Sequence, residues 1–196
     1  MTTIAAAIKK WEEAEEGRVA AEADRVDLYC QTPPIAKMDG TLNSLVECER
    51  LALSTNCIDR IVALGGMAKL KILSLGRNNL KKIDNLDANA GTLEELWLSY
   101  NHISSLDGLA GLTNLTTLYI GNNQIKHWDE LEKLKPLANL KDILLFGNPI
   151  YSEMPSYEMA RVEVLKYLPD LAKIDGDMVK PGERELAANP DAAADA

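Results

Sequence analysis

The sequence predicts an α/β solenoid, in which short parallel strands form one curved sheet and a helical cap covers each end of the stack. Three observations support this fold class. Segments of the chain repeat the pattern L-x-x-L-x-L-x-x-N-x-[IL], and their first residues are Cys48, Leu70, Leu93, Leu115 and Leu140. An asparagine stands at the same place in every segment, and the segments start 22 to 25 residues apart. Because this pattern and period are typical of leucine-rich repeats, we predict a leucine-rich-repeat solenoid with five full repeats.

The pair of apolar residues in the middle of each segment predicts a short strand. Side chains alternate along a strand, so two apolar residues separated by one other residue share a face. The asparagine follows where the chain leaves the strand, and we expect its side chain to hydrogen-bond backbone groups that would otherwise be buried unpaired. Because one coil cannot bury its apolar face alone, the coils must stack.

The segment before the repeats predicts a helical cap on the first coil. Residues 3–16 have the pattern of a helix with Ile4, Ile8 and Trp11 on one face. The Pro-Pro pair that follows favours an extended chain. It leads into a run from Ile35 that has the apolar spacing of a partial repeat without the strand core.

The segment after the repeats predicts a second helical cap. Ser156 is a suitable N-cap, Met159, Val162 and Leu165 are expected to point inward, and Pro169 ends the helix. The predicted organisation is an N-terminal helix with a lead-in segment (1–34), the repeats (35–150), a C-terminal helical cap (151–180) and a polar, acidic tail (181–196).

Charge and composition exclude several classes of partner. The 196-residue chain has a net charge of −9, which repels phosphate backbones and anionic lipid, so we expect neither nucleic acid nor a membrane as a partner. The N-terminus lacks the long apolar stretch of a secretory signal. The cysteines, Cys30, Cys48 and Cys57, form no CxxC pair. We therefore expect an intracellular protein with reduced thiols, in which Cys48 replaces a core leucine.

No residue pattern indicates catalysis, a cofactor or a metal ion. His102 and His127 have no Cys, His or carboxylate partner at metal-ligand spacing, so we expect both to be solvated surface residues. The glycines occupy repeat or turn positions and do not open a phosphate-binding loop. We expect a protein that is not an enzyme.

The outward face of the predicted sheet is the strongest candidate for a binding site. Strand residues that flank the core leucines point away from the core, and in the later repeats several of them are large and apolar. The predicted patch comprises Trp97, Tyr119, Leu144 and Phe146 with Ile72 and Tyr100, and its rim comprises Arg77, Glu95 and Asp142. Apolar patches with a polar rim commonly mark interaction sites, and Trp and Tyr are frequent anchors.

A column of small residues runs beside this patch. It comprises Ser54, Gly76, Ser99 and Gly121, and it predicts a shallow trough in which the backbone of a partner could lie. The exposed stretch of each strand has about the width of one helix, so a helix of another protein is the expected ligand. The alternative is that these aromatic residues pack only against the protein's own caps.

Several runs of the sequence resemble one known family. They are TIAAAIKKWEEAEE and LYCQTPPIAKMDGTL at the start, LALSTNCIDRI, LKILSLGRNNLKKI and TLEELWLSYN in the repeats, and GNPIY and ARVEVLKYLPDLAKIDG towards the end. Together they resemble the axonemal (ciliary outer-arm) dynein light chain 1 family, and the likeness extends to about Arg184.

This resemblance implies a non-catalytic subunit bound to the motor domain of a dynein heavy chain, at its microtubule-binding region, in the axoneme of a cilium or flagellum. It implies that the apolar sheet face is the docking surface and that light chains of this kind regulate motility. The segment from Met178 to Arg184 is implied to project toward the motor or the microtubule. A direct contact with tubulin, which is acidic, would need basic residues, and the scattered candidates are Lys81, Lys82 and Arg184.

Two alternatives come from other classes of repeat protein. One is a regulatory subunit of protein phosphatase 1, which has similar repeats in larger number. The other is a scaffold partner of a spliceosomal RNA-binding protein. The N-terminal helix and the small number of coils favour the dynein light chain.

Overall fold

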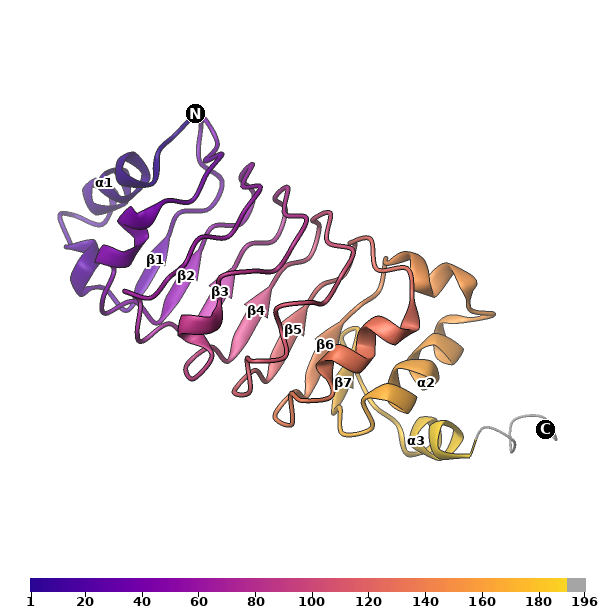
Figure 1. Ribbon diagram of the computed structural model, residues 1–196. Coiled ribbons are helices and arrows are strands. Elements are labelled where there is room, and N and C mark those ends of the chain that lie inside the picture. Colours follow the sequence, from indigo (N-terminus) through magenta and orange to yellow (C-terminus); the bar gives the residue numbers. More distant parts are fainter. Residues whose placement is uncertain (190–196) are drawn as a thin grey trace.

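The computed structural model describes residues 1–189, which form a stack of coils with one sheet along its length (Figure 1). Within this range the sheet has eight strands in the order of the sequence. They are β1 (Arg25–Asp27), β2 (Arg50–Ala52), β3 (Ile72–Ser74), β4 (Glu95–Trp97), β5 (Thr117–Tyr119), β6 (Asp142–Leu144), β7 (Lys173–Ile174) and β8 (Asp177–Met178). The helices are α1 (Ile4–Ala14), α2 (Tyr157–Tyr167) and α3 (Pro181–Ala188), and the 3-10 helices are η1 (Ala20–Glu22), η2 (Gly40–Ser44), η3 (Asp87–Asn89), η4 (Trp128–Leu134) and η5 (Pro149–Glu153).

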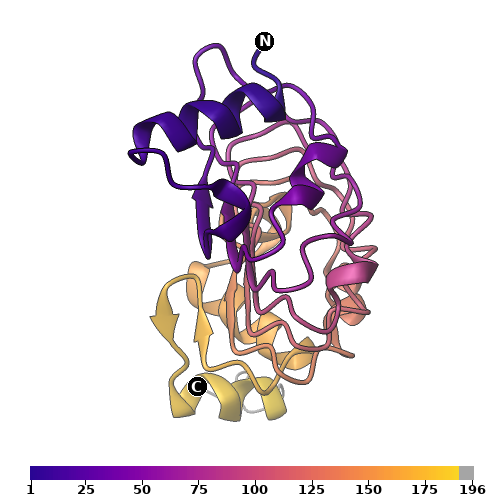
Figure 2. The same ribbon diagram turned by 90° about the vertical axis from the view of Figure 1, so that its left-hand side faces the viewer.

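The strands from β1 to β7 are parallel, and their central residues lie in register. Leu73 pairs with Leu51 on one side and with Leu96 on the other, and the same alignment continues across the sheet. Only β8 runs antiparallel to its neighbour. When the stack is viewed from its N-terminal end, successive coils lie behind one another, so equivalent residues form columns (Figure 2).

The first coil begins earlier in the sequence than predicted. The partial repeat from Ile35 lacks a strand of its own because that strand is β1, in which Val26 pairs with Leu51 of β2. Ile35 belongs to the later part of the same coil, and its backbone N–H donates to Oδ1 of Asn56 at 2.9 Å. The lead-in segment over residues 1–34 therefore contributes a strand to the sheet.

The interior of the stack is apolar along its whole length. The leucines of the repeat pattern are buried, and the predicted small core residue, Cys48, is fully buried among them. Burial raises the pKa of the Cys48 thiol to about 11, so the side chain is neutral at physiological pH.

The repeated asparagines form the predicted hydrogen-bonded ladder. Asn101 is representative: its Nδ2 donates to the carbonyls of Leu75 at 3.0 Å and Leu98 at 2.9 Å, and its Oδ1 accepts from the N–H of Leu80 at 2.9 Å. The side chain thus joins its own coil to the preceding one through backbone groups that are closed off from water. Equivalent bonds are made by Asn56, Asn78, Asn123 and Asn148.

Helix α1 covers the first coil as predicted, with a shift of its buried face. Thr3 is the N-cap, and its hydroxyl oxygen accepts from the N–H of Ala6. Ile4, Ala7 and Trp11 are buried, whereas the predicted Ile8 is only partly buried. The small Ala7 lets the helix lie close to the coil below it.

Helix α2 begins at the predicted N-cap, Ser156, but its inward face differs from the prediction. Met159, which we expected to point inward, is 39% exposed. Arg161 is buried instead, because its guanidinium has partners on every side. It donates to both carboxylate oxygens of Glu183 in α3 and to the carbonyls of Ile174 and Met178.

Residues 181–188 form helix α3, where the sequence predicted a polar tail. Pro181 stands in the first turn, and Glu183 accepts from the N–H of Lys180, which closes the helix start. The ion pair between Arg161 and Glu183 then holds α3 against α2. The rest of the predicted tail, residues 190–196, lies outside the described residues.

Candidate functional site

The outward face of β4, β5 and β6 places the predicted aromatic and apolar residues side by side. Trp97 is in register with Tyr119, and Tyr119 is in register with Leu144. All three side chains are half-buried, and their column is continued in the first half of the sheet by the nearly buried Ala52 and Ser74. The large residues of the face therefore begin abruptly at β4.

Trp97 is held in a fixed orientation by its neighbours. Its ring stacks on that of Tyr119, with centroids 6.0 Å apart and an interplanar angle of 23°. Its indole N–H donates to Oε2 of Glu95 at 3.1 Å, and the guanidinium of Arg50 lies over the ring at 5.2 Å from its centroid. An anchor that is already immobile loses little conformational entropy when a partner binds.

Tyr119 links the patch to its charged rim. Its hydroxyl donates to Oδ2 of Asp142 at 3.0 Å, and Lys173 of β7 donates to the same oxygen at 3.2 Å. Burial, together with the hydrogen bond and negative charge of Asp142, raises the pKa of Tyr119. The phenol therefore stays a neutral donor, and the rim residue Asp142 is occupied by partners within the protein.

The predicted trough of small residues is interrupted at its later end. Leu144 lies over Gly121, since a Cβ at this glycine would stand 2.0 Å from Cδ2 of Leu144. At Gly76 the nearest atom to such a Cβ is the carbonyl oxygen of Ser99, at 3.2 Å. Gly121 therefore serves to seat Leu144 and does not leave an open groove.

Phe146 packs against the protein's own cap and is also exposed to a partner, so it agrees in part with both interpretations of the aromatic residues. Its ring packs edge-on against Tyr151 at 5.9 Å and against Tyr157 at 5.8 Å, which are residues of the C-terminal cap. The side chain nevertheless remains 54% exposed. Between the sheet and the cap, Leu144, Phe146 and Tyr157 line a hollow of about 620 Å³, so the patch continues onto α2.

The remaining predicted residues of the face surround this patch. Arg77 lies over the exposed ring of Tyr100, with its guanidinium carbon 4.1 Å from the ring centroid. Ile72 is half-buried and pairs in register with Glu95, next to the Trp97 column. The Arg77–Tyr100 pair and Ile72 therefore lie on the same face of the sheet as Trp97.

Arg184 is not brought together with the other predicted residues. Its guanidinium donates to the carbonyls of Pro169 and Leu171, at the turn that follows α2. The expected projection of the segment from Met178 to Arg184 is therefore not seen for Arg184, which is folded back onto its own chain. Met178, in contrast, is 67% exposed.

Three residues shape the site in ways that the sequence did not indicate. Alternation places Arg50 on the outward face, but its contact with Trp97 cannot be assigned without the register. The same holds for the contact of Tyr157 with Phe146. Asp175 takes the place of a backbone acceptor: its Oδ1 accepts from the N–H groups of Leu145 and Phe146, at 2.6 and 2.9 Å, whereas the equivalent N–H of Ile120 donates to the carbonyl of Leu144 in the next strand. The Asp-Gly pair at the end of the last apolar run was the one available signal for this role.

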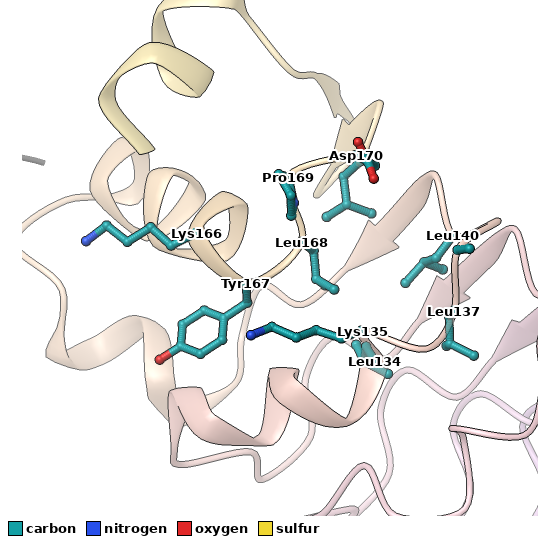
Figure 3. A pocket seen from close by; sticks show the side chains of 11 residues that line it. Leu134, Lys135, Leu137, Leu140, Lys166, Tyr167, Leu168, Pro169 and Asp170 are labelled. Atoms are coloured by element: carbon teal, nitrogen blue, oxygen red, sulfur yellow. The ribbon is translucent and has the colours of Figure 1, made fainter. Parts of the chain in front are cut away.

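A second hollow, of about 350 Å³, lies between η4 and the end of α2 (Figure 3). Its leucines belong to the buried core, and the ammonium of Lys135 lies 5.9 Å from the ring centroid of Tyr167. It forms the seam between the last coil and its cap. Among residues 1–189, no His, Cys, Asp and Glu side chains cluster as a metal site would require. No helix in this range has the length and apolar character to cross a bilayer.

Comparison with known proteins identifies close relatives over almost the whole chain. A family model described as Leucine Rich repeats (2 copies) matches residues 92–136. Dynein axonemal light chain 1 of Chlamydomonas reinhardtii is 56% identical over 95% of this chain and 95% of its own length. The proteins of the same name from Xenopus laevis and Homo sapiens are 57% and 53% identical, each over 94% of this chain and over 95% and 96% of their own length.

Solved structures share the fold at low sequence identity. A chain of the Drosophila melanogaster SNF/U2A′ complex matches with a TM-score of 0.64 and 24% identity, over 82% of this chain and 99% of its own. A leucine-rich-repeat protein of Leptospira interrogans matches with a TM-score of 0.63 and 23% identity, over 83% of this chain and 38% of its own. Both confirm the predicted leucine-rich-repeat fold.

Proposed function

Because the chain belongs to the dynein axonemal light chain 1 family, we propose that it is a non-catalytic subunit of ciliary outer-arm dynein in the axoneme. Its partner in this proposal is the motor domain of a dynein heavy chain, at the microtubule-binding region. The outward face of β4 to β6 is the docking surface, and binding there regulates ciliary motility.

The observation that carries this proposal is the fixed aromatic patch, which lies in a column whose positions on β2 and β3 are the small residues Ala52 and Ser74. Trp97 and Tyr119 stack on each other, and Leu144 and Phe146 continue the apolar surface to the cap. Trp and Tyr are enriched among the few residues that supply most of the affinity at protein interfaces, and an anchor that is already immobile loses little entropy on binding. A helix about 10 Å in diameter matches the exposed stretch of these short strands.

The two alternative partners have less support. The structural neighbour from the SNF/U2A′ complex shares the fold alone, at 24% identity, whereas the dynein light chains share more than half of their residues with this chain. A phosphatase partner has no supporting observation among the features of the face. A direct contact with tubulin is a separate part of the proposal, for which Met178 is exposed and Arg184 is engaged within the chain.

The experiment is calorimetric titration of the full chain with the recombinant microtubule-binding region of a heavy chain. Trp97→Ala should weaken binding by about 2 kcal/mol, or roughly thirtyfold, because Trp97 is the central anchor of the patch. The matched control is Tyr29→Ala, which removes an aromatic side chain that is 53% exposed next to β1. Circular dichroism should show that both variants keep the wild-type fold.

Equal affinities of the wild type and Trp97→Ala would remove this face from the heavy-chain contact. Affinity capture from ciliary extract tests the partner independently. Recovery of a phosphatase catalytic subunit or a spliceosomal protein, without dynein heavy chain, would refute the dynein assignment.

A further inference from the structure

Positive charge gathers on the edge where the first three coils leave the sheet. Lys37, Arg60, Lys81 and Lys82 are all exposed there, and among residues 1–189 none of them forms an ion pair. Many other cations are neutralised: Lys71, for example, is paired with Glu49 at 2.7 Å. In a chain with a net charge of −9, such a cluster is a marked local contrast. We call these four residues the basic edge.

The repeat itself brings these residues together. The N–H of Cys57 donates to the carbonyl of Ile35, and the N–H of Asn79 donates to that of Ile58, both at 2.8 Å. Each coil is therefore fixed to the next just before the basic edge. Lys37, Arg60 and Lys82 follow these junctions at the same distance along the chain, so they form one column across three coils.

The basic edge borders a hollow of about 380 Å³ with an apolar floor. Lys37, Arg60 and Lys81 line it together with Met38, which is 5% exposed, and the half-buried Val62. A floor of this kind can cover the methylene groups of a ligand while its charged ends meet the cations.

The nearby carboxylates leave the edge positive. Asp59 lines the same hollow, so three cations of the basic edge face one carboxylate there. Asp39 and Asp84 lie further along the same coils. Asp39 accepts from the N–H of Thr41 as the N-cap of η2, and Asp84 is half-buried with its Oδ1 shielded from solvent.

We propose that the basic edge binds a short glutamate-rich peptide of a partner protein. Three coils span about 10 Å, close to the length of three residues of an extended peptide, so a short run of glutamates lies within reach of the cations on all three coils. The Glu side chain, with its two methylene groups, suits the apolar floor. A long nucleic acid is a poorer ligand, because the other surfaces of this acidic chain repel it. This proposal is independent of the partner bound at the sheet face.

The test measures fluorescence anisotropy of fluorescein-labelled decaglutamate with the full chain at low salt. The triple variant Lys37→Gln, Arg60→Gln, Lys81→Gln should bind about tenfold more weakly than the wild type, because each exposed ion pair contributes a few-fold. Added salt should also weaken wild-type binding, since it screens exposed charges.

The matched control is Lys10→Gln, Lys69→Gln, Lys166→Gln, which removes the same charge from exposed sites elsewhere. It should bind decaglutamate within about twofold of the wild type, because it leaves all four cations of the basic edge in place. Equal weakening in both triple variants would overturn the proposal, because net charge alone would explain the binding. An absence of wild-type binding at low salt would also overturn it.

Two further outcomes would assign the edge to another occupant. Tighter binding of a decathymidylate than of decaglutamate, lost in the edge variant, would replace the peptide with a nucleic acid. Self-association in analytical ultracentrifugation, lost in the edge variant, would replace it with a second copy of this chain. Thermal melting by circular dichroism should be equal for both variants, since all six positions are exposed.

Discussion

The first half of the sheet, β1 to β3, and the second half, β4 to β6, share one backbone but present different surfaces. The register is continuous between them, and the same buried positions hold both together. The outward column changes from Ala52 and Ser74 to Trp97 and Tyr119 within two neighbouring strands. This difference shows that the inward residues determine the structure of each coil, whereas the outward residues can vary without disturbing that structure.

The two halves also end differently. At the first coil α1 buries apolar side chains, among them Ile4 and Trp11. At the last coil α2 and α3 are joined by the buried ion pair between Arg161 and Glu183. The end of the molecule next to the aromatic patch therefore responds to pH in a way that the other end does not.

The largest expected effect comes from breaking the asparagine ladder, which the two halves of the sheet share. Asn101→Ala removes three hydrogen bonds and leaves the buried N–H of Leu80 without a partner, whereas the carbonyls of Leu75 and Leu98 keep the neighbouring ladder asparagines as donors. It should reduce the free energy of unfolding by about 3 kcal/mol. Urea denaturation measures this loss. Asn79→Ala, at an exposed position of the neighbouring coil, should change it by less than about 0.5 kcal/mol. Similar losses for both variants would contradict the role of the ladder.

A second substitution distinguishes the halves at one repeat position. Gly121→Ala places a Cβ against Leu144 and 2.8 Å from the carbonyl oxygen of Phe146, so it should cost about 2 kcal/mol of unfolding free energy through overpacking. Gly76→Ala meets only the carbonyl oxygen of Ser99 and should cost less than half as much. Gly111→Ala, with open space around it, is the control for the change of residue type. An equal cost at the first two sites would show that both Leu144 and the backbone at Phe146 can move aside.

The C-terminal cap should weaken in acid. The hydrogen bonds from Arg161 hold the pKa of Glu183 below its usual value in the folded state. Its contribution is therefore complete above the unfolded pKa, about 4.5, and is lost as the pH falls through the lower folded pKa. Glu183→Gln should remove about 1.5 kcal/mol of unfolding free energy at pH 7 and flatten its decline below pH 4.5.

Urea denaturation between neutral pH and about pH 3 measures this dependence. The control is Glu185→Gln, which neutralises an exposed carboxylate in the same helix. A pH profile of Glu183→Gln parallel to that of the wild type would mean that the ion pair does not stabilise the cap.

The smallest expected effect sharpens the comparison at the rim of the patch. Phe146 and Tyr29 occupy the same repeat position at opposite ends of the sheet and are almost equally exposed, at 54% and 53%. Phe146→Ala should weaken heavy-chain binding by about 1 kcal/mol, whereas Tyr29→Ala should leave it unchanged. Calorimetric titration measures both. An equal loss would extend the contact to the first half of the face.

The repeat made most of the fold predictable from the sequence. Its leucines and asparagines act locally in each coil, and five similar copies support one another. Strand β1 escaped prediction because Val26 and Leu28 lack the preceding leucine and the following asparagine of the pattern. Helix α3 was not predicted because its partner, Arg161, is a charged residue in the middle of another helix. Such a residue is usually expected to be exposed.

The composition of the patch was predictable, but its internal contacts were not. Alternation along the strands placed Trp97 and Tyr119 on the outward face. The position of Arg50 over Trp97, by contrast, requires a side chain to reach across β3, and no local pattern encodes such a contact. The seating of Leu144 over Gly121 likewise depends on the distance between two strands.

The register of the strands also sets a limit on the length of any helix contact across them. Neighbouring strands repeat every ~4.8 Å, whereas the turns of a helix repeat every ~5.4 Å. Because the helix pitch and the strand spacing differ, the turns of a helix fall out of step with the strands. The mismatch is only about 1 Å across β4 to β6, but it exceeds half a helical turn across the whole parallel sheet. One straight helix therefore stays within about a quarter of a turn of the strand spacing over three adjacent strands, and the aromatic patch occupies three.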